Sequence, residues 1–308
     1  MFKALLGICA LAIGLGGAAV AQDRVTQDRV TLGWGRLFNN DTLGDTRDRW
    51  QTGSYTVSRL RGLSWTGSLP SDPGEIVELR LSGRVIAPAS LTAPSALDRR
   101  YAGVITVGLH SHFDLRGWDT SLGADLVFTG PKTGISSFQG TIHDALSMKK
   151  PTVFGNQIGN GVYPTLVAET GRSLTLPGNT VLRPFVEAQV GAEDFVRIGG
   201  DLMLGGFGAG ALMLRDPVTG QRYQGIAGTR TTGFSYTVGG DVARVFDSIY
   251  LPDGGAAVLS DSRSRLRAGV NWQGESSQVF YGVTYLGPEF EAQSQGQFVG
   301  SVNLRLRF

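Results

Sequence analysis

The sequence predicts an all-β fold, a transmembrane antiparallel up-and-down β-barrel of about twelve strands with a short helix in an extracellular loop. Three observations predict it. Residues 301–308 alternate polar and apolar side chains and end on Phe308. Short segments with the same period of two recur along the chain, and the N-terminus has the features of an export signal.

The alternation matters because successive side chains of a strand point to opposite faces of a sheet. Residues 301–308 would present one apolar face and one charged face, which suits lipid on one side and water on the other. A closed barrel satisfies every backbone hydrogen bond inside a membrane. The alternative is the edge strand of a soluble β-sandwich.

The N-terminal segment predicts export. Lys3 supplies a positive charge, residues 4–18 form a short apolar run, and Ala19-Val20-Ala21 is a small-x-small cleavage site. We therefore expect a cleaved signal peptide over 1–21, a β-barrel over 22–308 and a location in the bacterial outer membrane. The only cysteine, Cys9, would leave with the signal, so the mature chain would hold no disulfide.

Composition agrees with a barrel. The chain has 45 glycines and 18% charged residues, and outside the signal region it has no apolar run long enough for a helical span. A net charge of +2 is too small to indicate a nucleic-acid partner. We expect a monomer whose partners are the outer membrane and its lipids.

Individual segments justify the strand count. Period-two alternation is clear over 77–85, 105–109, 122–128, 266–272 and 279–285, and an even number of strands is expected when both chain ends are periplasmic. Aromatic residues near segment ends would form the girdles that barrels place at membrane interfaces: Trp34, Trp118, Trp272 and Tyr285. His110 and His112 lie two apart on a predicted strand and are interpreted as lumen residues.

One stretch, residues 136–146, has helical instead of strand spacing. Ser136 or Ser137 could cap its start. Gln139 and His143 are four residues apart and would share one face, and an adjacent face would carry an apolar stripe of Phe138, Ile142 and Leu146. The helix would direct an amide and an imidazole at one object. It could equally be a loop helix packed on the barrel rim with a hydrogen-bonded histidine.

The first strand ends in a cluster of oxygen-bearing side chains, Asn39-Asn40-Asp41. Carboxylate and amide oxygens suit a hard cation such as Ca²⁺. The same residues are also ordinary strand-ending turn residues. No Gly-x-Ser-x-Gly elbow, phosphate loop or dinucleotide fingerprint occurs in the chain.

These motifs together resemble the LpxR-like family of outer-membrane lipid A 3'-O-deacylases. The resemblance spans the mature chain and rests on motifs that occur in the same order. These are Asn39-Asn40-Asp41, Asp48–Gly53, Ile86-Ala87-Pro88, Asp98–Gly103, Gly130-Pro131, Gln139-x-x-x-His143, Glu289-Phe290 and the terminal Phe308.

The resemblance implies an active site between the barrel wall and a helical loop, at the level of the outer leaflet. It implies that His143 activates water, that Asn40 and Asp41 help to bind Ca²⁺, and that Thr52 and Gln139 act on the reacting ester. A lysine expected after Ile86-Ala87-Pro88 is absent, so either Arg99 or Arg100 would replace it in binding a substrate phosphate, or the headgroup of the substrate is different. The carboxylate that should orient His143 is not evident from the sequence, because the adjacent Asp144 would not face it on a helix.

The expected function is a carboxylic ester hydrolase that removes a 3'-O acyl chain from lipid A, with water as nucleophile and Ca²⁺ as cofactor. Imidazole accepts protons at neutral pH, and a cation or fixed donor must hold the charge that develops on the carbonyl oxygen. Two alternatives stay open. One is a serine-dependent outer-membrane phospholipase using Ser136 or Ser137 with His143, and the other is a non-catalytic pore or structural barrel.

Overall fold

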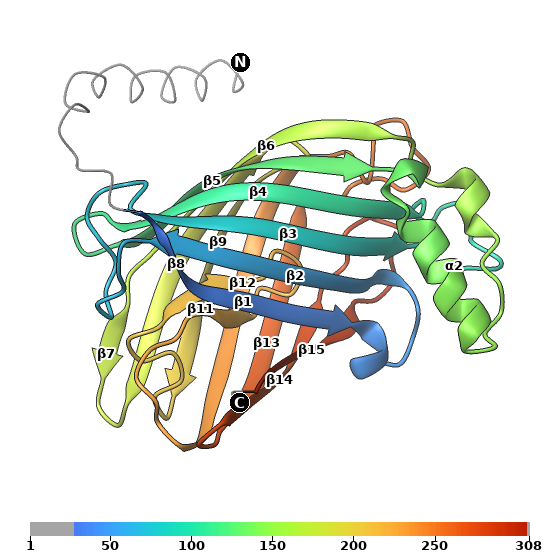
Figure 1. The fold of residues 1–308 in the computed structure, drawn as a ribbon. Coiled ribbons are helices and arrows are strands. Elements are labelled where there is room, and N and C mark those ends of the chain that lie inside the picture. The colour runs from blue at the N-terminus through green and yellow to red at the C-terminus, as the bar shows by residue number, and fades with distance from the viewer. Residues whose placement is uncertain (1–27, 307–308) are drawn as a thin grey trace, which may run out of the picture.

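The computed structural model describes residues 28–306, and twelve of its strands form a closed antiparallel barrel (Figure 1). Neighbours in sequence pair around most of the wall, and the ring closes where β1 pairs with β15 and β6 pairs with β8. The barrel prediction is confirmed. The predicted signal peptide and Phe308 lie outside the described residues. The barrel strands are β1 (Val30–Asn40), β2 (Trp50–Gly62), β3 (Ile76–Ala87), β4 (Ala102–Asp114), β5 (Asp119–Thr129), β6 (Gly161–Gly171), β8 (Thr180–Val190), β9 (Glu193–Leu204), β12 (Gly233–Ser248), β13 (Ser262–Gln273), β14 (Ser277–Leu286) and β15 (Gln297–Leu306).

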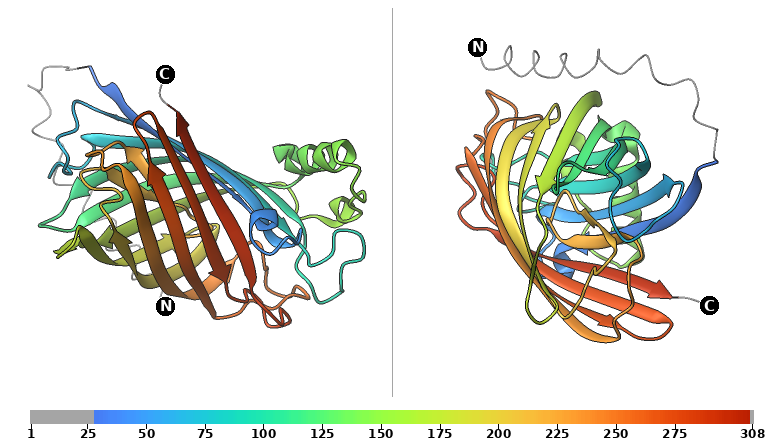
Figure 2. Two further views of the ribbon diagram at one scale, coloured as in Figure 1. Left: turned by 90° about the horizontal axis from the view of Figure 1, so that it is seen from below. Right: turned by 90° about the vertical axis from the view of Figure 1, so that its left-hand side faces the viewer.

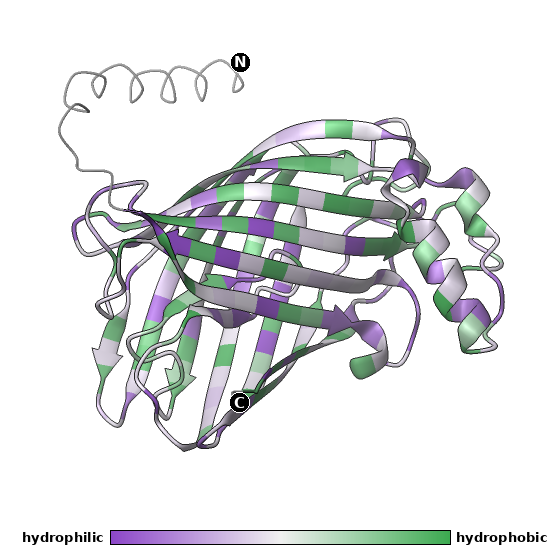
Figure 3. Cartoon of the chain, in the orientation of Figure 1, coloured by the Kyte–Doolittle hydropathy of each residue, from purple (hydrophilic) through white to green (hydrophobic). Residues whose placement is uncertain are grey.

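The period-two pattern separates the two faces of the wall. On β3, Leu79 and Leu81 point outward and are 46% and 54% exposed, while Glu78, directly before Leu79, is fully buried in the lumen. Figure 3 shows the same alternation of hydrophobic and hydrophilic residues along the front strands. His110 and His112 are lumen residues, as predicted. The Nε2 atom of His110 lies 2.8 Å from Asp125 Oδ1, and the Nε2 atom of His112 lies 2.8 Å from Glu78 Oε2.

A second, two-stranded sheet lies inside the barrel and was not expected from the sequence. β10 (Leu212–Arg215) pairs with β11 (Arg222–Ile226) in the connection between β9 and β12. In the view along the barrel this hairpin lies within the ring of strands (Figure 2, right). Its apolar side packs on wall residues that point inward, forming a cluster that includes Leu37, Leu60, Leu214 and Tyr223. The lumen is therefore partly filled at the end of the barrel opposite the helix.

The remaining elements are short: β7 (Leu174–Leu176), the 3-10 turns η1 (Asp41–Leu43), η2 (Pro131–Thr133) and η3 (Val153–Asn156), and the helix α2 (Ile135–Ala145). α2 and η1 lie at one end of the barrel, which we call the α2 end (Figure 1). No helix in residues 28–306 is long and apolar enough to span a membrane.

The start of α2 differs from the sequence prediction. The helix begins at Ile135 and its N-cap is Gly134, which makes no side-chain capping bond and has φ +75°. Neither Ser136 nor Ser137 caps it. The chain reverses at Gly134 after the η2 turn, which leaves both serines inside the helix. Glycine suits this position because its left-handed backbone has no Cβ to clash.

Candidate active site

α2 packs against the outer surface of the barrel wall. Its first residue, Ile135, sits over Gly83 of β3 and Gly103 of β4, which share the outward face with Leu81 and Val107. A Cβ added at Gly103 would lie only 2.7 Å from the Ile135 Cβ, whereas one at Gly83 would be 3.6 Å from the Ile135 Cδ1. Gly103 thus permits a close approach of helix to wall.

The polar face of α2 is buried and its apolar face is exposed. Gln139 and His143 are 7% and 5% exposed, so the prediction that they share one face is confirmed, and that face is the buried one. Phe138, Ile142 and Leu146 are 64%, 42% and 65% exposed. This is the reverse of a helix on a soluble protein, whose apolar stripe faces the core. α2 is therefore built to bring polar groups to the wall.

Asp48 is the acidic partner of these groups. It lies in the loop between η1 and β2, and its Oδ2 is 2.9 Å from His143 Nε2. Its other oxygen, Oδ1, accepts a hydrogen bond of 3.3 Å from Gln139 Nε2. The orienting carboxylate that sequence reasoning could not assign is thus Asp48. The available signal was its place at the start of the Asp48–Gly53 motif.

The contacts of His143 indicate which nitrogen faces the site. Nδ1 lies 3.0 Å from the Lys149 carbonyl oxygen, which can only accept, so Nδ1 carries a proton. Nε2 faces the Asp48 carboxylate. Nε2 is therefore the atom that can exchange a proton with Asp48, or with a water molecule that takes the place of the carboxylate.

Thr52 occupies an irregular position at the start of β2. The pairing of β2 with β3 shifts register between Gln51 and Gly53, which is the pattern of a β-bulge. Nearby, Trp50 has φ +50°. The side chain of Gln297 on β15 donates a 3.1 Å hydrogen bond to the Arg49 carbonyl oxygen and accepts a 2.8 Å hydrogen bond from Gln51 N. Bulges and strained residues of this kind re-aim side chains at functional sites.

The Thr52 side chain is buried, and its hydroxyl has no hydrogen-bond partner in the described part of the chain. The Gln139 Oε1 atom is likewise buried without a partner. Unsatisfied buried polar atoms carry a free-energy cost and call for an explanation such as a ligand. Both atoms are available to a bound group.

η1 places Asn40 and Asp41 beside the bulge. Asn40 caps η1 by accepting a 2.8 Å hydrogen bond from Thr42 N, and a Cβ on Gly53 would lie 3.1 Å from the Asn40 Nδ2. Asp41 is 1% exposed and its Oδ2 accepts a 2.9 Å bond from Arg49 N. The turn role considered for Asn40 from the sequence is therefore real, and its amide nitrogen still faces the bulge.

The electrostatics of Asp41 favour a cation or a proton. Burial raises the pKa of Asp41 to about 8, with help from the charges of Asp48 and Asp45 and against the backbone bonds from Arg49 and Thr42. Its Oδ1 is buried without a partner.

The orphan oxygens of Asp41, Thr52 and Gln139 are a carboxylate, a hydroxyl and an amide, the donor types that Ca²⁺ takes. Residues 28–306 contain no group of three or more His, Cys, Asp or Glu side chains arranged for a metal. The buried, unpartnered carboxylate oxygen of Asp41 is thus the atom among these three that best suits a hard cation.

The two predicted substrate-binding arginines lie in different surroundings. Arg99 is buried and forms an ion pair with Glu289, whose carboxylate also accepts two 3.1 Å bonds from Gln51 Nε2. Against the effect of burial, Arg99 and Arg263 lower the pKa of Glu289 to about 2. Arg100 is exposed and donates to the Asn156 and Gln157 carbonyls at 3.1 and 2.7 Å. Of the pair, only Arg100 lies at the surface.

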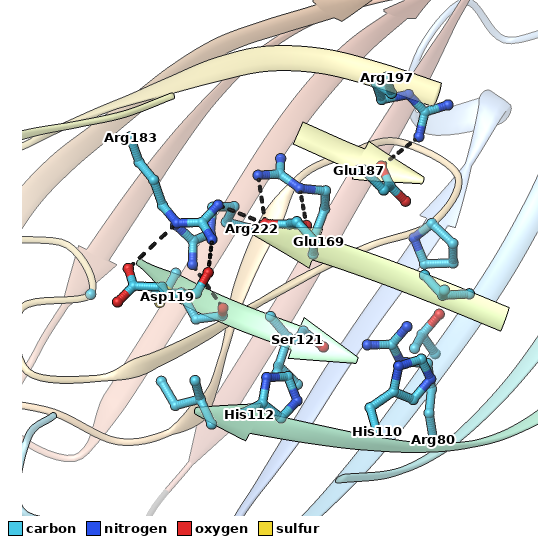
Figure 4. A pocket seen from close by; sticks show the side chains of 18 of the residues that line it. Arg80, His110, His112, Asp119, Ser121, Glu169, Arg183, Glu187, Arg197 and Arg222 are labelled. Atoms are coloured by element: carbon cyan, nitrogen blue, oxygen red, sulfur yellow. Dashed lines mark hydrogen bonds and ion pairs between the residues drawn. The ribbon is translucent and has the colours of Figure 1, made fainter. Parts of the chain in front are cut away.

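A large cavity lies elsewhere in the barrel. It holds about 860 Å³ inside the lumen, and its walls carry ion pairs such as Arg183 with Glu169 and Arg197 with Glu187 (Figure 4). Neither His143 nor Thr52 lines it. The candidate active site is therefore separate from this cavity.

Comparisons with known proteins identify the fold and the family of this chain. The profile of the family described as "Outer membrane protein LpxR" matches residues 5–308. LpxR from Salmonella typhimurium superposes with a TM-score of 0.73 at 16% identity, covering 90% of this chain and 100% of that chain. The NanC porin reaches a TM-score of only 0.43 at 5% identity, covering 90% of this chain and 100% of its own.

The β domain of the Bordetella autotransporter BrkA reaches a TM-score of 0.41 at 14% identity, covering 90% of this chain and 99% of its own. No curated protein matches the sequence significantly. The family profile spans nearly the whole chain, and the solved LpxR structure shares its barrel. The chain therefore belongs to the LpxR family of outer membrane proteins.

Proposed function

We propose that this protein is an outer-membrane hydrolase that removes an ester-linked 3'-O acyl chain from lipid A in the outer leaflet. The observation that carries the proposal is the cluster of His143, Gln139 and Asp48 between α2 and the loop that leads into β2. None of these three side chains lines the cavity in the lumen. Family membership supports the lipid A substrate.

In the proposed reaction, a water molecule displaces the Asp48 carboxylate from its 2.9 Å contact with His143 Nε2 and donates a hydrogen bond to that nitrogen. Nε2 takes the proton from water as the oxygen attacks the ester carbonyl, and Asp48 stabilises the imidazolium that forms. The Nδ1 bond to the Lys149 carbonyl keeps the ring oriented throughout. His143 then returns the proton to the leaving alkoxide, so atoms and protons balance.

Thr52, Gln139 and Asn40 are proposed to bind the reacting ester. The unpartnered hydroxyl of Thr52 and the Asn40 amide nitrogen are donors on the same side of the bulge, where they could stabilise a developing oxyanion. Ca²⁺ bound by Asp41 and Asn40 would supply further positive charge for that oxygen. Arg100, at the exposed rim, is the better placed of the two arginines for a substrate phosphate.

The contacts of the helix favour this mechanism over the serine-dependent alternative. The ring nitrogens of His143 face Asp48 and Lys149. Ser136 is buried and accepts a 3.5 Å bond from Gln157 Nε2, and Ser137 lies on the exposed side of the helix. The hairpin in the lumen argues against an open pore.

The direct test is a chelation and inhibition assay on the purified full-length protein with lipid A in detergent. We expect release of one fatty acid, loss of that release with EGTA, recovery with added Ca²⁺, and no inhibition by a serine-directed phosphonate. Activity that survives EGTA would remove the cation from the mechanism, and phosphonate inhibition would favour the serine enzyme. The protein is expected to act as a monomer, which detergent-corrected light scattering would check.

A further inference from the structure

The exposed side of α2 forms a continuous apolar surface with the barrel wall. Ile135 packs on the outward glycine Gly103, and Phe138, Ile142 and Leu146 continue its face along the helix as α2 leaves the wall. Met148, directly after the helix, is 46% exposed. We call Phe138, Ile142, Leu146 and Met148 the α2 stripe. Figure 2 (left) shows α2 projecting beyond the strand ends.

Lysine is confined to the borders of this stripe. Apart from Lys3, the only lysines of the chain are Lys132, Lys149 and Lys150. Its other permanently charged basic side chains are arginines. Lys132 precedes α2 and the other two follow it, and all three are exposed. No acidic side chain among the described residues forms an ion pair with any of them.

A groove on the outer wall lies beside Lys132. It holds about 370 Å³ beside η2, with Ile105, Phe128 and Val162 on its apolar side and Lys132, Thr133 and Asn160 on its polar side. Ile105 and Val162 belong to the outward wall face of β4 and β6. A groove with hydrocarbon on one side and a lysine on the other matches a lipid, whose acyl chains adjoin an anionic headgroup.

From this arrangement we infer that the α2 stripe and its three lysines form a docking surface for the anionic lipids of the outer leaflet. The stripe would lie among the acyl chains while Lys132, Lys149 and Lys150 contact phosphate groups. An apolar face bordered by lysines is the pattern of helices that lie in a membrane interface. Docking would hold α2, and with it His143, at the depth of the headgroups. The inference needs only the outer-membrane location and not the proposed hydrolysis.

The test compares two labelled cysteines on one helix in a Cys9→Ser background. Leu146→Cys lies on the stripe, and Thr141→Cys is an exposed control on a polar face of the helix. Each variant carries bimane and is placed in nanodiscs with or without phosphatidylglycerol. We expect the label at position 146 to be quenched by spin-labelled lipid and protected from iodide. The label at position 141 should be quenched by iodide and not by spin-labelled lipid.

The lysines are tested by Lys149→Ala/Lys150→Ala in the Leu146→Cys protein. Its control is Arg116→Ala/Arg172→Ala, which removes the same charge from exposed turns at the other end of the barrel. The ratio of lipid-inserted to water-exposed label should fall about fivefold for each lysine lost, and only in anionic nanodiscs. The control should leave it unchanged.

Two results would overturn the inference. Equal iodide quenching at 146 and 141 would show that the stripe faces water, and protection at 146 without lipid quenching would show that a protein covers it. Since no outcome depends on lipid A turnover, an inactive protein whose label inserts would refute the proposed function alone. An active protein with an aqueous label would refute the docking surface alone.

Discussion

At the scale of single residues, the chemistry of the site rests on one carboxylate shared by two side chains. Asp48 binds His143 through one oxygen and Gln139 through the other, which fixes both on the same side of the loop. A histidine held between a carboxylate and a carbonyl has a defined ring orientation. Asp48 is thus a positioning residue for the proposed base.

Replacing Asp48 with Asn should lower kcat about 100-fold, because the imidazolium loses its counter-charge and the ring its orientation. KM should change little, since Asp48 acts through His143. Asp48→Glu should restore part of the rate. Asp144→Asn is the matched control, being the exposed carboxylate next to His143 in sequence. Steady-state kinetics on lipid A would decide, and equal losses in the Asp48 and Asp144 variants would contradict the assignment.

A substitution at Thr52 should lower catalytic activity without lowering the thermal stability of the protein. Thr52→Val keeps the shape of the side chain and removes a hydroxyl that has no protein partner. We expect kcat to fall about 100-fold if the hydroxyl serves the oxyanion. The thermal midpoint should stay the same or rise, because no buried polar atom is left unsatisfied. A variant that loses stability along with activity would instead mark Thr52 as structural.

At the scale of elements, α2 is amphipathic with its polar side turned to the protein. Its spacing predicted both the Gln139–His143 face and the apolar stripe, and both exist. What spacing could not predict was which face would be buried, since that depends on lipid and not water surrounding the barrel. The start of the helix was also missed, because the turn at Gly134 outweighed the capping preference of the serines.

The contact between Ile135 of α2 and the glycines of the barrel wall can be tested by substitution. Gly103→Ala would place a methyl 2.7 Å from the Ile135 Cβ and must displace the helix. Gly83→Ala is the control under the same residue, where 3.6 Å is an ordinary contact. We expect Gly103→Ala to lower kcat between about tenfold and 100-fold, because a small misplacement of the base is costly. Equal activity in the two variants would show that α2 does not position His143.

At the scale of the whole molecule, the barrel wall follows directly from the alternation in the sequence. Leu79 and Leu81 face outward and Glu78 inward, as period two requires. Residues 212–226 were missed as an internal element because their short apolar runs pack inside the lumen against Leu37 and Leu60, a contact that no local pattern specifies. The role of Asp48 was missed for the same reason, because its partners Gln139 and His143 lie on α2, far from it in the sequence.

The internal hairpin leads to a prediction about permeability. Replacing residues 209–229 with a short Gly-Ser linker should open the lumen and give measurable ion conductance in planar bilayers, where the unchanged protein conducts little. It should also lower thermal stability, because a buried apolar cluster is lost. Shortening the exposed loop over 92–97 is the control and should do neither. Equal conductance with and without the hairpin would show that it does not obstruct the barrel.

The most direct test of the whole account is mass spectrometry of lipid A from intact cells that express the protein or its His143→Ala variant. The proposed function predicts that the unchanged protein removes one 3'-O acyl unit from lipid A and that the variant, present at the same level in the outer membrane, leaves it intact. Lipid A that is identical in the two strains would contradict it.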